Sequence, residues 1–95
     1  MTDVYDVDVP KTLGEDGKYS LKIDIRSDDD VLGPGLFIYG FMPGSNAEKQ
    51  GMLHVGDELL CVNDIDVEGG ALDDLIFAMQ NEDYAESDVV PVMVR

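Results

Sequence analysis

The sequence predicts a small α+β domain in which six strand segments are accompanied by one short helix and one longer helix. Hydrophobic and polar residues alternate over residues 19–26, which is the period of a half-buried strand. The chain has 95 residues, of which 44% are hydrophobic, enough for one core and too few for two. We therefore expect a single domain over residues 1–95. Apolar residues recur at helical spacing over residues 71–80, at Leu72, Leu75, Ile76 and Met79.

The first half of the chain predicts three strands joined by polar loops. Valine alternates with aspartate before Pro10, and this proline ends the first strand because it cannot donate to a sheet ladder. The second strand places Tyr19, Leu21, Ile23 and Ile25 on one face. The predicted segments are strand 4–9, loop 11–18, strand 19–26, loop 27–35 and strand 36–41.

The middle of the chain predicts a short helix between two glycine turns. Ser45 follows a Pro-Gly turn as the N-cap of helix 46–50, and Gly51 ends that helix. Met52 and Leu53 form an apolar pair that we expect to be buried. A second turn precedes strand 58–62, where Cys61 is expected to be a small buried hydrophobe.

The last third predicts a very short strand at 65–67, helix 71–80, a polar loop at 81–87 and a final strand at 89–94. Asp73 and Asp74 lie in the first turn of the helix, where negative charge is favourable. Pro91 interrupts the final strand, which predicts that this strand lies at a sheet edge or carries a bulge there.

Charge and cysteine content limit the classes of partner. The formal net charge is −15, which disfavours nucleic acids and anionic membranes as partners because both require basic patches on the protein. The charge favours basic partners, or it contributes only to solubility. The chain has no apolar run near the roughly 20 residues of a membrane span. A single cysteine excludes an intrachain disulfide. These features predict a cytoplasmic setting.

The residue types that carry enzyme chemistry are scattered. His54 is the only histidine, it lies in a turn, and the serines fall in separate segments without a nucleophile-elbow pattern. Asp28, Asp29 and Asp30 are adjacent, whereas calcium loops space their ligands at alternate positions. We expect no enzyme activity, no metal site and no cofactor.

Residues 43–63 (PGSNAEKQGMLHVGDELLCVN) resemble the central signature of PDZ domains. The order of the predicted elements agrees with the animal-type PDZ fold, so the resemblance covers nearly the whole chain. It implies a six-stranded antiparallel β-sandwich or partly open barrel, capped by the two helices. The matching positions are Pro43, Gly44, Ser45, Ala47, Gly51, Leu53, Val55, Gly56, Asp57, Leu59, Val62 and Asn63.

The resemblance implies capture of the C-terminal residues of partner proteins by strand addition in a groove between strand 19–26 and helix 71–80. The loop that holds the ligand carboxylate would comprise Lys18, Tyr19, Ser20 and Leu21, with Ser20 where the family has glycine. Lys11 or Lys18 would assist, and loop length leaves the choice open. The groove would be lined by Leu21, Lys22, Ile23, Asp24, Ile25, Leu72, Ile76 and Met79.

The first residue of the groove helix sets the ligand class in the family. A histidine there selects serine or threonine at the third-last ligand position, whereas this chain has Leu72. We therefore expect a hydrophobic-x-hydrophobic C-terminus, and Asp24 predicts basic ligand residues upstream. The alternative is binding of an internal motif, or dimerisation through a sheet edge such as residues 4–9.

The expected partners are C-terminal tails of other proteins, including membrane receptors and signalling proteins. The domain would belong to a scaffold or adaptor, would be a monomer, and would be cytoplasmic, reaching the membrane-associated cortex through its partners.

Overall fold

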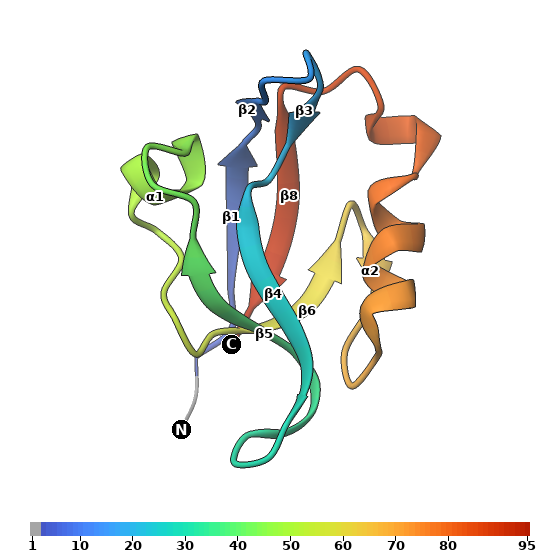
Figure 1. The fold of residues 1–95 in the computed structure, drawn as a ribbon. Helices are drawn as coiled ribbons and strands as arrows, with labels where there is room; N and C mark the ends of the chain where they lie inside the picture. Colours follow the sequence, from blue (N-terminus) through green and yellow to red (C-terminus); the bar gives the residue numbers. More distant parts are fainter. Residues whose placement is uncertain (1–2) are drawn as a thin grey trace.

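The computed structural model describes residues 3–95 as a mixed α+β fold around one six-stranded antiparallel sheet (Figure 1). The strand order is β1-β8-β6-β5-β4, and β7 pairs with β6 off this path. A separate two-stranded sheet joins β2 to β3. The fold class expected from the sequence is confirmed, and the sheet is not closed into a barrel. No helix in residues 3–95 is long and apolar enough to cross a membrane.

The elements have the following bounds. The strands are β1 (Tyr5–Pro10), β2 (Thr12–Leu13), β3 (Tyr19–Ser20), β4 (Ile23–Asp29), β5 (Gly33–Phe41), β6 (Glu58–Val62), β7 (Ile65–Asp66) and β8 (Val89–Val94). The helices are α1 (Asn46–Gln50), α2 (Leu72–Met79) and the 3₁₀ helix η1 (Glu82–Tyr84).

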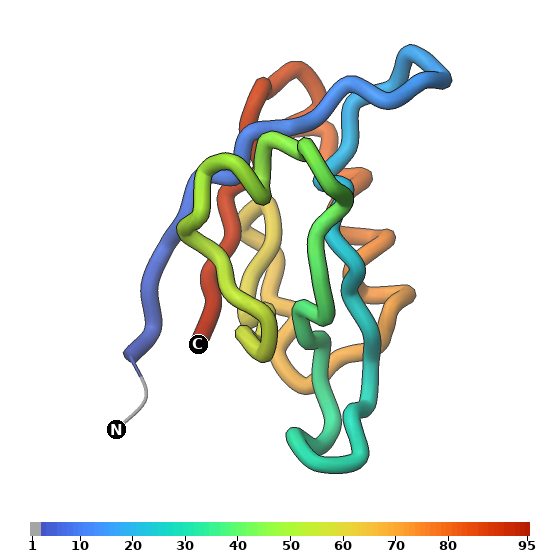
Figure 2. Tube along the Cα trace, turned by 60° about the vertical axis from the view of Figure 1, so that its left-hand side comes forward, coloured from blue at the N-terminus to red at the C-terminus, as the bar shows by residue number. Residues whose placement is uncertain are grey.

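The core lies inside the curved sheet. In Figure 1, β4 passes in front of β1 and β8, with α1 on one side of the molecule and α2 on the other. The tube in Figure 2 shows the same curvature from a second direction. Ile23 and Ile25 of β4 are partly buried and pack against the core cluster. The fully buried hydrophobic residues of that cluster are Val7, Val9, Leu21, Leu36, Ile38, Ala47, Leu53, Leu59, Val62, Val67, Ala78, Val90, Val92 and Val94.

Helix α1 begins and ends where the sequence predicts. The Ser45 hydroxyl accepts a hydrogen bond from the Glu48 amide at 3.2 Å, which satisfies one of the free donors of the first turn. Gly51 closes the helix with φ 70°, a left-handed conformation that glycine adopts without steric cost.

The prediction of one continuous strand over residues 19–26 is wrong. The chain is interrupted at Leu21 and Lys22, and Lys22 has φ 56°. The part before the break pairs with β2, inside the segment expected to be a loop. The part after it pairs with β5 and continues to Asp29. Hydrophobic alternation persists across the break, so it could not show that the pairing partner changes.

Two side chains expected in the core lie outside it. Met52 is 49% exposed, whereas its neighbour Leu53 is 4% exposed. After the helix ends, consecutive side chains point in different directions. The burial of Leu53 therefore does not bury Met52 as well. Cys61 is partly exposed because it lies on the outer face of β6, opposite the buried Val62.

Pro91 lies in the interior of the sheet, which corrects the expectation of an edge strand or a local bulge. Strand β8 pairs with β1 on one side and β6 on the other, and the β6–β8 irregularity falls between Leu59 and Cys61. The Pro91 carbonyl accepts from the Asn63 amide at 2.9 Å. The Asn63 carbonyl, which a Pro91 N–H would otherwise bond, accepts from Nδ2 of Asn81 at 2.9 Å. A side chain thus replaces the missing ladder donor.

Candidate functional site

Strand β4 forms the free edge of the main sheet. It is the last strand in the order and pairs only with β5 within the described residues, so its other backbone edge has no strand partner. Helix α2 runs alongside this edge in both views (Figures 1 and 2). Ile23 and Ile25 from β4 and Met79 from α2 pack against the same core. An open edge beside a helix is the arrangement that accepts an added strand.

The apolar residues of α2 divide into a core face and an exposed face. Ala78 is buried, and Leu75 and Met79 pack against the core. Leu72 and Ile76 are 42% and 55% exposed. Their spacing of four residues puts both on the flank of the helix next to the core face. Two exposed large hydrophobic side chains one turn apart form an apolar strip that the core does not use.

The residues expected to bind a ligand carboxylate are only partly together. Tyr19 and Ser20 lie in β3, hydrogen-bonded to β2, and Tyr19 is 65% exposed. Ser20, expected at the glycine position of the loop, does not have a positive φ. That conformation belongs to Lys22, directly before β4. The Lys22 carbonyl accepts from the Met42 amide at 3.0 Å, which fixes the turn to the end of β5.

The outward side of β4 carries a charged cluster that sequence reasoning missed. Arg26 contacts Asp24 at 3.1 Å and lies 4.6 Å from the centre of the Tyr39 ring. The hydrogen bond from Arg26 to Asp24 raises the pKa of the guanidinium. Asp29 accepts from the Tyr39 hydroxyl, and this bond raises the pKa of that phenol. Only the i, i+2 spacing of Asp24 and Arg26 could have indicated the first contact.

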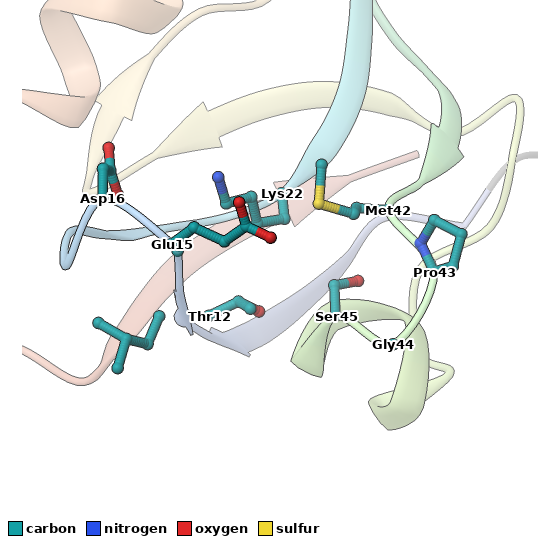
Figure 3. A pocket seen from close by; sticks show the side chains of 10 residues that line it. Thr12, Glu15, Asp16, Lys22, Met42, Pro43, Gly44 and Ser45 are labelled. Carbon is teal, nitrogen blue, oxygen red and sulfur yellow. The ribbon is translucent and has the colours of Figure 1, made fainter.

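A hollow lies beside the Lys22 turn and is not lined by residues of α2. It has a volume of about 560 Å³ and separates the β2–β3 hairpin from the turn that leads into α1 (Figure 3). Glu15, Asp16 and Lys22 bring charges of both signs to it, beside the apolar Met42. This hollow could not be predicted from the sequence, because its walls come from residues 12–16, residue 22 and residues 42–45, which are far apart in the chain.

No metal centre is evident in the described part of the chain. Residues 3–95 contain no group of three or more His, Cys, Asp or Glu side chains that could hold an ion. His54 is exposed and lies 3.9 Å from the Asp57 carboxylate in a turn.

A curved antiparallel sheet with a free edge beside an amphipathic helix is the architecture of a peptide-binding module. The family model described as "PDZ domain" matches residues 6–86, and the chain belongs to the PDZ family. PDZ domains are protein-interaction modules rather than catalytic domains, and they bind peptides of partner proteins.

Curated proteins that resemble the chain agree with this assignment. It is 52% identical over 40 residues to Partitioning defective 6 homolog gamma from Homo sapiens, covering 42% of this chain and 11% of that protein. It is 35% identical over 69 residues to Multiple PDZ domain protein from Rattus norvegicus, covering 70% of this chain and 3% of that protein. The chain thus spans about a tenth or less of the length of these relatives.

Among solved structures, the fold is similar to the second PDZ domain of Dlg1 from the choanoflagellate Monosiga brevicollis. The TM-score is 0.72 with 20% sequence identity, and the match covers 98% of both chains. At this identity the likeness concerns the fold alone.

Proposed function

We propose that residues 1–95 form one peptide-binding domain that captures the C-terminal residues of partner proteins by strand addition between β4 and α2. The observation that carries this proposal is the free edge of β4, which begins directly after the left-handed turn at Lys22. The exposed apolar strip on α2, the helix that runs alongside this edge, supports it (Figure 1). Backbone hydrogen bonds along β4 would give affinity, and the α2 strip would give side-chain selectivity.

The usable edge of β4 is short. Pairing with β5 is irregular between Asp24 and Ile25 and again between Ser27 and Asp29. The extra residue at the first irregularity belongs to β5, whereas at the second Asp28 of β4 itself has φ 58°. A bulge of this kind turns the backbone away from regular strand geometry. We therefore assign strand addition to residues 23–27, which suits a ligand of about five residues at one ligand residue per strand residue.

We place the carboxylate-binding loop at Leu21, Lys22 and Ile23 rather than at residues 18–21. A left-handed residue between two others turns successive backbone N–H groups toward one point, which is a geometry that binds anions. Three of the six basic residues, Lys11, Lys18 and Lys22, fall within residues 11–22. Lys11 reaches the Tyr84 carbonyl at 3.5 Å, whereas Lys18 is exposed and free to attract a carboxylate.

The ligand preference follows from the α2 strip. Leu72 is the first residue of α2 and has no side-chain hydrogen-bonding group, so it favours a hydrophobic third-last ligand residue. Ile76 and Met79 would receive the last side chain. Asp24 is paired with Arg26, so exposed Asp28 is the better partner for basic residues farther upstream.

The wider setting is part of the same proposal. The domain would act as a monomeric, cytoplasmic scaffold or adaptor element. Its ligands would be tails of membrane receptors or signalling proteins, which would bring it to the cell cortex.

The test is a calorimetric titration with a peptide ending in Val-x-Val and with its C-terminal amide, each at low and high salt. The free acid should bind at least about tenfold more tightly, because the amide loses a charge-assisted interaction. Equal binding of the free acid and the amide would contradict the proposal that the domain captures a C-terminal carboxylate. It would favour recognition of an internal motif at the same edge.

A further inference from the structure

A second surface lies on the outer face of β1, β8 and β6, on the opposite side of the sheet from the core. A hollow of about 460 Å³ is lined there by Asp6, Asp8, Cys61, Asp64, Pro91, Val92 and Met93. None of these residues belongs to the groove between β4 and α2. We refer to the six residues other than the buried Val92 as the acidic sheet face.

The strand register builds this face as rows across the sheet. Met93 pairs with Asp6 on one side and with Cys61 on the other, and Cys61 pairs with Asp66. Directly paired residues of neighbouring strands point to the same face. The row therefore consists of the Asp6 carboxylate, the Met93 thioether, the Cys61 thiol and the Asp66 carboxylate. The neighbouring Val92 points into the core.

A second row nearer the end of the sheet is less complete, because its third position is the buried Asn63 and the exposed Asp64 follows in the next turn. Asp8 pairs with Pro91, whose carbonyl accepts from the residue before Asp64. The centre of the face is thus apolar or weakly polar, formed by the half-buried Pro91, Met93 and Cys61. Exposed aspartates stand on both sides of it.

The carboxylates around this centre are not neutralised within residues 3–95. The ion pairs in that part of the chain join Arg26 to Asp24, His54 to Asp57, and Arg95 to Glu58 and Glu68. None of them involves Asp6, Asp8, Asp64 or Asp66. Asp64 accepts a hydrogen bond from the Tyr84 hydroxyl, and Asp66 accepts one from the Glu68 amide, but neither donor is a cation. The face therefore presents negative charge without a cationic partner around an apolar floor.

The thiol of Cys61 responds to the same surroundings. Burial raises its pKa most, and the charges of Asp66, Asp6, Asp64 and Glu68 raise it further. This agrees with carboxylates from β1, from β7 and from the turns on either side of β7 lying around one point of the face.

We propose that the acidic sheet face is a second docking surface, and that its occupant is a strand-like segment of a partner protein in which lysine or arginine alternates with apolar residues. The apolar side chains would cover Met93 and Pro91, and the cations would reach the flanking carboxylates. A second copy of this chain does not fit, because its own face would place carboxylates against carboxylates.

The probe is an eight-residue peptide of alternating lysine and leucine, acetylated and C-terminally amidated so that it has no carboxylate for the groove. Amide chemical shifts of the ¹⁵N-labelled protein locate the contact. They should change at Cys61, Met93 and Asp8 and remain unchanged at Ile23 and Leu72. Changes centred on the β4–α2 pair instead would overturn the proposal without bearing on carboxylate capture.

Matched charge variants separate a specific face from general attraction to an acidic protein. Asp6→Asn, Asp8→Asn and Asp64→Asn together should weaken binding by about tenfold. Asp30→Asn, Asp73→Asn and Glu86→Gln remove the same charge from other exposed positions and should weaken it by no more than about twofold. Equal weakening by both triples would contradict a defined surface.

The single cysteine provides a third readout. Because Cys61 is the only thiol in the chain, the pH dependence of its ¹³Cβ chemical shift reports thiolate formation on this face alone. Bound lysines should lower the Cys61 pKa in the wild type, and an unchanged titration at saturating peptide would count against the proposal. Light scattering that shows self-association through this face would replace the peptide partner with a second copy.

Discussion

The side-chain amide of Asn63 donates a hydrogen bond to the carbonyl of Ala78 at 3.1 Å, joining the end of β6 to the last turn of α2. Both residues are buried, and Asn63 has φ 51°. The neighbouring Asn81 donates in turn to the Asn63 carbonyl. The C-terminal end of α2 is therefore fixed to the end of β6 through Asn63.

We expect replacement of Asn63 to reduce stability in two separable parts. Asn63→Gly keeps the backbone conformation and removes the bond to Ala78, which should cost about 1–3 kcal/mol. Asn63→Ala should cost about 1 kcal/mol more, because a Cβ residue without a local hydrogen bond is strained at positive φ. Urea unfolding of the two variants measures both parts. Alanine at least as stable as glycine would contradict the strain argument.

Lys22 combines a strained backbone with a charge beside the proposed carboxylate site. Lys22→Gly should be more stable than Lys22→Ala by about 1 kcal/mol, since only glycine relieves the positive φ. Both should weaken binding of a free-acid peptide several-fold at low salt, and the loss should shrink at high salt. Lys49→Ala, on α1, is the charge-matched control. Equal weakening by that control would show only the effect of net charge.

Leu72 sets the ligand class in the proposed groove. Leu72→His should shift preference toward serine or threonine at the third-last ligand position, because imidazole can hydrogen-bond a hydroxyl. Phe77→His changes an exposed residue on the other side of the same helix and should leave the preference unaltered. A peptide array with both variants measures this, and unchanged selectivity in Leu72→His would refute the assignment.

Asp29 should stabilise the β4–β5 turn in a pH-dependent way. Its carboxylate accepts from the Tyr39 hydroxyl and from the Leu32 and Val31 amides, and these bonds lower its pKa below 3.8. The folded state therefore favours the ionised form. This contribution is present above about pH 4 and is lost as pH falls through the lowered folded pKa.

In the wild type, stability should fall as the pH is lowered from about 5, and Asp29→Asn should reduce this fall. The urea midpoint of unfolding, measured at a series of pH values, reports the change. Asp30→Asn removes the next carboxylate, which accepts none of these bonds, and should leave the fall in place. An unchanged acid profile in Asp29→Asn would mean that these bonds do not persist in solution.

Elements specified by neighbouring residues could be predicted from the sequence. Ser45 and Gly51 delimit α1 because caps act within one turn of the chain. The helical spacing of Leu72, Leu75, Ile76 and Met79 identified α2, whereas the exposure of Leu72 and Ile76 is known only from the structure. The family resemblance in residues 43–63 supplied the fold, because that segment carries the turns and buried positions of the family.

Features that depend on contacts distant in sequence could not be predicted. Alternation continues through Leu21 and Lys22 although the pairing partner changes from β2 to β5. A lysine gives no sequence signal for a positive φ, so the left-handed turn at Lys22 had no indication in the sequence. Pro91 indicated an edge, yet the amide of Asn81 supplies the missing donor in the sheet interior.

The sequence by itself determined the family and the two helices, because these follow from spacing along the chain. The tertiary structure decided which strand edge stays open, which residue turns the chain before β4, and which aspartates surround Cys61. Those features arise from strand order and register, and pairs such as Asp6 and Met93 meet only after the sheet has formed.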